Sequence, residues 1–165
     1  GDYASFIEQY TGQASEPGDF VDKEGKVLGK HKGQIHYTIG QRRGLGISAP
    51  ESLYVCGKSL DTNKVILGGK GDLMSTCCYI NDINLIPWDH LDKPIQCKVK
   101  TRYRQPEQPA TVEQLGDDLI KITFQEPQRA VTPGQAAVLY DGDMVLGGGT
   151  ILSEEAAAKA VASTN

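Results

Sequence analysis

Residues 96–105 read QCKVKTRYRQ, and their alternation of side-chain types indicates a β-strand. Because successive strand residues point to opposite faces, the odd-numbered residues share one face and the even-numbered cations share the other. The odd-numbered face suits the interior of a barrel, and it holds Cys97, Val99, Thr101 and Tyr103. The even-numbered face is an outer row of four cations, namely Lys98, Lys100, Arg102 and Arg104.

The cations of this row lie about 7 Å apart along a strand, and the segment contains no acid to neutralise them. Such a row matches the spacing of backbone phosphates, so it predicts an RNA-binding surface. Arg102 and Arg104 are the sharper candidates, since a planar guanidinium can hold a phosphate with two hydrogen bonds. A solvated strand face, paired with acids on a neighbouring strand, is the alternative that the segment leaves open.

Outward from this stretch, the sequence predicts β-structure throughout from about residue 77. Short strands recur at a spacing of roughly ten residues, with glycine, proline and aspartate in the turns between them. Six such strands suggest a small closed barrel or a sandwich. They are expected at residues 78–86, 95–104, 110–115, 119–124, 136–140 and 144–152.

The first half of the chain predicts a smaller α+β unit. Residues 2–10 carry one apolar helical stripe, and residues 11–18 are rich in glycine and proline, which break helices. Two hairpins and one weakly alternating strand are expected at residues 20–22 with 26–29, 52–59 with 64–67, and 34–38. The predicted organisation is a helical linker at 1–13, a central domain at 14–76, a β-barrel at 77–152 and a tail without assigned function at 153–165.

Charge is distributed unevenly along the chain, whose net value of −4 at pH 7 does not by itself favour a nucleic-acid partner. Between Lys23 and Arg43 there are six cations and one acid, Glu24. Local patches, rather than the total, decide whether phosphates are attracted. Arg42 and Arg43 precede a glycine, a pattern typical of a phosphate-gripping loop. A turn that docks onto a neighbouring domain is the alternative for this loop.

Membrane proteins and common enzyme classes are disfavoured by what the sequence lacks. There is no apolar run near the roughly 18 residues of a membrane span, and we expect a cytoplasmic protein. Spacings typical of a nucleophile elbow, a zinc protease or a Walker loop do not occur. The glycine run 67–71 is interpreted as the exit from the first unit and not as a nucleotide site. The run 147–149 is interpreted as a strand bulge or tight packing contact. The chain begins at Gly1, so we expect a processed chain or, preferably, an excised piece of a longer protein.

The cysteines do not have metal-ligand spacing. No C-x-x-C pair occurs, and the three histidines do not complete a zinc site. We therefore expect reduced packing cysteines and no metal site. They are Cys56, Cys77, Cys78 and Cys97.

A longer stretch, residues 29–46, reads GKHKGQIHYTIGQRRGLG. It resembles the central domain of bacterial tRNA-specific 2-thiouridylases, in which a G-x-H-x-G segment leads into Y-T-L-G-Q-R-K-G-L-G. Residues 99–105 (VKTRYRQ), 130–135 (AVTPGQ) and 146–149 (LGGG) resemble the carboxy-terminal barrel of that family. The four motifs follow the family's order over most of the chain, so the chain is identified as a member.

This resemblance implies an enzyme of three parts. In such proteins an amino-terminal PP-loop domain binds ATP, with magnesium, and adenylates the C2 oxygen of the wobble uridine. A cysteine persulfide, fed by a sulfur-relay protein, then replaces that oxygen with sulfur. The central domain and an elongation-factor-like antiparallel β-barrel hold the tRNA. The residues matching Arg102, Tyr103 and Gln135 are expected at the tRNA.

The chain also departs from the family pattern, because it has no PP-loop motif and its four cysteines match neither sulfur-carrying cysteine. We therefore expect the tRNA-docking part of an ATP-dependent tRNA-uridine 2-sulfurtransferase, inactive alone and without a catalytic residue or cofactor of its own. Its expected partners are tRNA, the PP-loop domain and, for the whole enzyme, the sulfur donor. Structural bracing of the catalytic domain and a stand-alone translation-factor-like RNA-binding barrel are the alternatives. The expected tRNA-binding residues are Arg102, Tyr103, Arg104, Gln135, Lys98, Lys100, Arg42 and Arg43.

Overall fold

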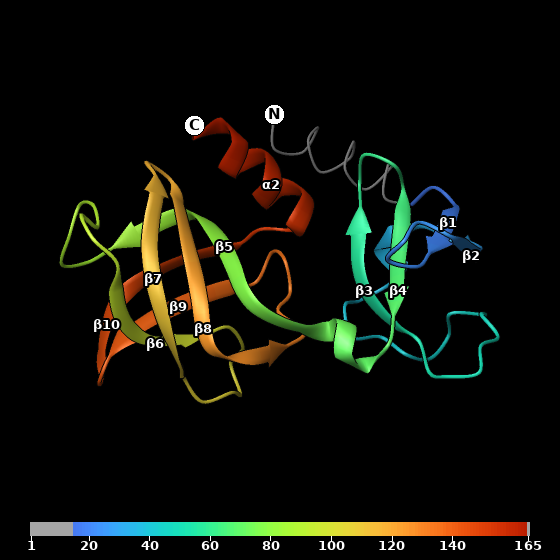
Figure 1. Ribbon diagram of the computed structural model, residues 1–165, viewed down its shortest axis with the longest axis horizontal. Coiled ribbons are helices and arrows are strands. Elements are labelled where there is room, and N and C mark those ends of the chain that lie inside the picture. Colours follow the sequence, from blue (N-terminus) through green and yellow to red (C-terminus); the bar gives the residue numbers. More distant parts are fainter. Residues whose placement is uncertain (1–14, 165) are drawn as a thin grey trace. The chain divides into compact units, whose positions relative to one another are not determined.

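The computed structural model describes residues 15–164. The chain divides into two compact units, Gly1–Leu73 and Met74–Asn165. The helix expected at residues 2–10 lies outside the described residues. Together the two units are mainly β, as the sequence predicted (Figure 1).

The first unit is a mixed four-stranded sheet in the order β2-β1-β4-β3. Both predicted hairpins are confirmed: β1 pairs with β2, and β3 pairs with β4, each antiparallel. The sequence pattern did not reveal that β1 and β4 pair in parallel. The strands are β1 (Gly18–Val21), β2 (Val27–His31), β3 (Tyr54–Ser59) and β4 (Lys64–Gly68).

One expected strand of this unit is absent. Residues 34–38 do not form a strand, since Gln34–His36 is instead the 3-10 helix η1. The side chain of Gln34 is buried and donates through Nε2 to the carbonyl oxygen of Ser59, 2.7 Å away. That hydrogen bond ties the segment to Ser59, the last residue of β3. The weak alternation of residues 34–38 could not predict this contact. A second 3-10 helix, η2 (Lys70–Leu73), ends the unit.

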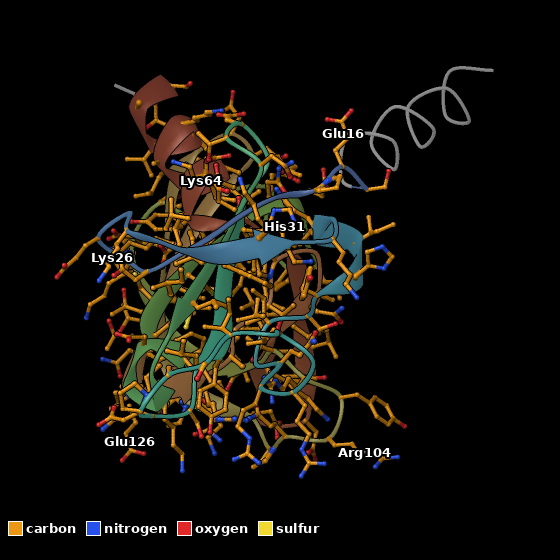
Figure 2. The ribbon with its side chains drawn as sticks, turned by 90° about the vertical axis from the view of Figure 1, so that its right-hand side faces the viewer. Glu16, Lys26, His31, Lys64, Arg104 and Glu126 are labelled. Carbon is orange, nitrogen blue, oxygen red and sulfur yellow. The ribbon has the colours of Figure 1, made fainter. Side chains whose placement is uncertain are left out.

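A buried histidine organises the core of the first unit. His31, 1% exposed, lies edge-on to the rings of Phe20 and Tyr37, with centroids 5.8 and 5.9 Å away. Its Nδ1 accepts from the Gly33 amide, so Nε2 carries the proton and donates to the carbonyl oxygen of Asn63. Figure 2 labels His31 on its strand. His31 is therefore a packing and positioning residue of this sheet.

The second unit is a closed antiparallel barrel of six strands in the order β10-β5-β8-β7-β6-β9 (Figure 1). Closure confirms one of the two architectures expected for this half and leaves no free sheet edge. Its interior is filled by apolar side chains with no exposure, such as Ile80, Val112, Ile120 and Leu139. The strands are β5 (Met74–Leu85), β6 (Ile95–Lys100), β7 (Gln108–Gly116), β8 (Leu119–Arg129), β9 (Ala136–Asp141) and β10 (Met144–Ile151).

The glycine run of β10 is a packing feature, as expected. The register of β10 against β9 shifts between Val145 and Gly147, which marks a bulge. A Cβ at Gly147 would stand 2.1 Å from the Asn84 carbonyl oxygen, and one at Gly148 would stand 2.2 Å from that of Ala137. Neighbouring backbone therefore excludes larger residues from these positions.

The strand predicted at 95–104 is shorter than expected, because β6 ends at Lys100. Its pairing with β7 ends with Val99 opposite Gln108, and its pairing with β9 ends with Lys100 opposite Val138. The β7 side of the ladder stops there because β7 begins at Gln108, whereas β9 continues to Ala136 without pairing with residues after Lys100. Residues 102–105 form a turn instead, in which the Gln105 amide donates to the Arg102 carbonyl oxygen at 3.2 Å.

The tail, to which the sequence assigned no function, contains a helix that packs one residue into the interior. It forms α2 (Glu154–Ser163), capped by the Ser153 hydroxyl, which accepts from the Ala156 amide at 3.1 Å. Ala157 of this helix is buried. After the helix, Thr164 lies against Gly116, where a Cβ would come within 2.9 Å of it. No helix in the described part of the chain is long and apolar enough to span a bilayer.

Candidate nucleic-acid interface

Strand register brings two loops together at one end of the barrel. The β6–β7 loop leaves β6 beside the start of β9, because Lys100 pairs with Val138. The loop at residues 130–135 lies directly before β9. We call residues 100–105 and 130–135 the basic loop pair. Figure 2 shows Arg104 at the outer end of a loop, pointing away from the ribbon.

The outer face of β6 is confirmed up to its last residue. Lys98 is exposed and Lys100 half-buried, whereas Val99 and Thr101 are buried at 1% and 7% exposure. The residues opposite the two lysines on the neighbouring strands are uncharged, namely Pro109, Tyr140 and Val138. The register therefore does not support the alternative in which these lysines pair with acids on a neighbouring strand.

Arg102 joins the two loops. Its Nη2 donates to the Ala130 carbonyl oxygen at 2.8 Å, and the Thr132 hydroxyl donates to the same oxygen at 2.8 Å. Ala130 is 2% exposed and has a φ of 52°, so its carbonyl is held in an unusual backbone conformation. Arg102 was expected as a free member of a cation row, but the structure gives it a second task, which is to position the loop before β9.

Tyr103 is where the sequence prediction was wrong about direction. The alternation placed it inside the barrel, yet it is 91% exposed. The strand has already ended, so the alternation no longer applies. The Nζ of Lys100 lies 5.5 Å from the centroid of its ring, a cation–π distance. An exposed aromatic ring thus stands among the cations of the basic loop pair.

No carboxylate within residues 15–164 forms an ion pair with these cations. Among residues 15–164 the ion pairs join Lys23 to Asp72 and Lys30 to Asp19. Neither involves Lys98, Lys100, Arg102 or Arg104. Arg129, which the sequence analysis overlooked, is also exposed, directly before Ala130. Its only sequence signal was proximity to the 130–135 motif.

Gln135 is presented by a tight turn. The Gln135 amide donates to the Thr132 carbonyl oxygen at 3.3 Å, and Gly134 between them has a φ of 87°. These features fit a type II turn, in which glycine is favoured at the third position. The Ile151 amide donates to the Gln135 carbonyl oxygen at 2.9 Å, so the backbone is held to β10 while the residue stays exposed.

Arg42 and Arg43 lie in the first unit, on a loop docked to β3. Gln41 holds this loop: its Nε2 donates to the Arg43 carbonyl oxygen, and its own carbonyl accepts from the Val55 amide, both at 2.8 Å. Leu45 is buried as an anchor, whereas both arginines are exposed. They line a hollow of about 360 Å³ that also includes Glu51.

The cation cluster between residues 23 and 43 is weaker than the sequence suggested, because Lys23 and Lys30 are each paired with an acid. Arg42 and Arg43 belong to neither ion pair found within residues 15–164.

The glycine-rich turn after β4 does not fit a nucleotide phosphate. The Gly69 amide donates to Oδ2 of Asp72 at 2.9 Å, so a carboxylate already occupies the place that a phosphate oxygen would take. This hydrogen bond, followed by the one to Lys23, holds the pKa of Asp72 below its ordinary value of 3.8. The turn is closed by its own acid rather than open to a phosphate.

Two of the four cysteines, Cys78 and Cys97, pack against the barrel core. Burial, and then the neighbouring Cys77, raise the pKa of Cys78 from 9.0 to about 12. Burial, and then Asp141, raise the pKa of Cys97 to about 11. Both thiols therefore stay protonated near neutrality, which makes them poor nucleophiles. All four cysteines are free thiols.

Comparisons with known proteins cover both units. A model of the tRNA methyl transferase PRC-barrel domain matches residues 4–69, and one of the aminomethyltransferase beta-barrel domain matches residues 75–151. The tRNA-specific 2-thiouridylase MnmA of Acetivibrio thermocellus is 46% identical over 150 residues, 91% of this chain and 42% of that protein.

Two further relatives carry the same name. The protein of Clostridioides difficile is 44% identical over 150 residues, 91% of this chain and 42% of its own length. That of Gloeothece citriformis is 47% identical over 151 residues, 92% of this chain and 43% of its own length. The chain thus spans less than half the length of these curated relatives.

Proposed function

Because the chain belongs to the family of tRNA-specific 2-thiouridylases, matching its central and carboxy-terminal domains, we propose that it is the tRNA-binding portion of such an enzyme. The whole enzyme would install sulfur at C2 of the wobble uridine, with ATP and a cysteine persulfide, in the cytoplasm. Its PP-loop domain would supply the chemistry and receive sulfur from a donor protein. This chain would hold the tRNA in the position that the PP-loop domain requires.

The observation that carries the proposal is the set of cations at one barrel end that no carboxylate within residues 15–164 neutralises. Lys98 and Arg104 are exposed, and Lys100 is half-buried beside Tyr103. Their mutual repulsion is relieved when a polyanion replaces the counterions around them. The junction between Arg102 and Ala130 fixes their loops before the RNA arrives, which lowers the entropic cost of binding.

Recognition by this surface would depend on backbone and shape. The major groove of an A-form helix is too deep and narrow for side chains to read base edges. Cations on a rigid barrel end contact phosphates, and these contacts position the RNA without specifying its sequence. The choice of the target nucleotide would then rest with the catalytic domain.

The chemistry would take place outside this chain. The turn at Gly69 is closed by Asp72, and the thiols of Cys78 and Cys97 have raised pKa values. Neither feature suits nucleotide activation or sulfur transfer. We therefore expect no thiolation by this chain alone.

A structural role for the cations is the second candidate, and the hydrogen bond from Arg102 to Ala130 shows that this arginine stabilises the barrel end itself. Arg102 is consequently a poor probe of RNA binding. Lys98 and Arg104 are better probes, because both are exposed and neither takes part in an ion pair among the described residues.

The test is the affinity of the 165-residue chain for fluorescently labelled tRNA over a salt series. Three phosphate contacts, made by Lys98, Lys100 and Arg104, predict a slope of log affinity against log salt of about −2 to −3, or a loss of roughly 20- to 40-fold between about 50 and 200 mM salt. The double variant K98A/R104A removes two contacts, so its salt dependence should be shallower, with a slope closer to zero by about two. Lys93→Ala, an exposed cation in the β5–β6 loop, is the matched control. Salt-independent binding, or a double variant equal to wild type, would favour bracing.

A further inference from the structure

Tyr103 differs from the other tyrosines that the structure describes. Tyr37 is buried, and Tyr54, Tyr79 and Tyr140 are half-buried, whereas Tyr103 is 91% exposed. Its apolar ring area gains nothing from the core. The fold therefore does not account for an aromatic side chain at this position.

The turn that carries the ring is fixed by hydrogen bonds. The Gln105 amide closes the turn onto the Arg102 carbonyl oxygen, and the Arg102 side chain ties the same turn to Ala130. Lys100 places its ammonium over the ring, 5.5 Å from the centroid. A cation thus faces one side of the ring, and the high exposure leaves the ring broadly accessible to solvent.

We infer that Tyr103 stacks on one unpaired base of the bound RNA while Lys100 and Arg104 contact the phosphates flanking that nucleotide. This inference rests on the proposed function and names its substrate class: RNA with an unstacked nucleotide, rather than a continuous duplex. Bases within a duplex are covered on both faces by their neighbours, so only an unpaired base offers a face to the ring. Stacking accepts any base, which suits a surface that otherwise reads phosphates.

The phenolic hydroxyl offers a competing explanation, because it could donate to a phosphate without any stacking. Two substitutions separate the two contacts. Tyr103→Phe keeps the ring and removes the hydroxyl, whereas Tyr103→Leu keeps an apolar side chain and removes the ring. Since the side chain is almost fully exposed, neither change disturbs the core.

The experiment compares two RNA hairpins of equal length and charge, one with a single unpaired nucleotide and one fully paired. The 165-residue chain should bind the first about tenfold more tightly, the usual effect of one base stacked on one aromatic ring. Tyr103→Phe should keep this preference and Tyr103→Leu should lose it. With 2-aminopurine at the unpaired position, binding should change its emission for wild type and Tyr103→Phe but not for Tyr103→Leu. Trp88→Leu, in the β5–β6 loop, is the aromatic control.

The outcomes separate this inference from the proposed function. If neither hairpin nor tRNA binds at low salt, the proposed function fails and the inference fails with it. If both hairpins bind equally and Tyr103→Leu matches wild type, stacking is overturned while the proposed function stands. If Tyr103→Phe loses as much affinity as Tyr103→Leu, the hydroxyl is the contact and stacking is likewise overturned.

Discussion

Arg102 donates from Nη2 to the carbonyl oxygen of Ala130 across 2.8 Å, which joins two loops 28 residues apart in sequence. The Thr132 hydroxyl reaches the same oxygen. This shared acceptor gives the barrel end a fixed shape. Substitution of Arg102 would therefore change the stability of the barrel end as well as any RNA binding.

The shared acceptor predicts non-additive stability changes. Arg102→Ala and Thr132→Val should each cost about 1 kcal/mol, because one donor still satisfies the Ala130 oxygen. The double variant should cost more than the sum, since it leaves a buried carbonyl unsatisfied. Urea unfolding followed by the fluorescence of Trp88, the single tryptophan of the chain, measures this. Strict additivity would show that the two donors act independently.

The loop of Arg42 and Arg43 predicts a second, separable contribution to tRNA binding. The double variant R42A/R43A should lower the salt slope by about one for each phosphate that the loop no longer binds. Lys23→Ala is the control from the same unit, because the charge of Lys23 is already paired with Asp72. Equal slopes for wild type and the arginine variant would assign this loop to domain docking instead.

The raised pKa values of Cys78 and Cys97 predict slow alkylation. Iodoacetamide near pH 8 should label both thiols much more slowly in the folded chain than in guanidinium chloride, because the reactive thiolate is scarce in the folded state. Mass spectrometry of the digested chain gives the two rates. Rapid labelling of either residue in the folded chain would contradict the burial.

The same thiols predict a loss of stability at high pH. Above about pH 9 the unfolded chain releases thiol protons that the folded chain retains, so unfolding becomes easier as pH rises from there toward 11 or 12. Below pH 9 both states hold these protons, and the contribution vanishes. Cys78→Ala should show a flatter decline than wild type in urea titrations at each pH. Parallel curves would show that burial of this thiol has no such effect.

A carboxylate at the β7–β8 turn predicts a further stability change. Asp118 accepts from the amides of Asp82 and Ile83, at 3.0 and 2.8 Å, where Asp82 has a φ of 51°. Asp118→Ala should cost about 1–3 kcal/mol, because hydrogen bonds to a charged group are among the stronger ones. Asp118→Asn, which keeps one acceptor oxygen, should cost less. Asp117→Ala, one residue earlier in the same turn, is the control.

Much of the fold could be read from local pattern. The two hairpins of the first unit and the alternation of β6 up to Thr101 were predicted correctly, because turn residues and period-two alternation act over a few residues. The parallel contact of β1 with β4 and the 3-10 turn at Gln34 were not predicted. Both depend on partners far along the chain.

The candidate site shows the same division. Lys98, Lys100, Arg104 and Gln135 are at the surface as expected. Tyr103 was assigned to the wrong face, because the alternation was extended past Lys100, where β6 ends. The junction of Arg102 with Ala130 could not be foreseen, since nothing local links the two residues.

By itself, the sequence determined which side chains alternate along β6, where the glycines permit close backbone contact, and which family the motifs resemble. Only the tertiary structure decided where β6 stops, that Tyr103 faces solvent, and that the basic loop pair is joined through Arg102. The physical reason is that side-chain direction within a strand follows from covalent geometry, whereas the end of a strand follows from the register of its neighbours. Register is set by the closed barrel as a whole.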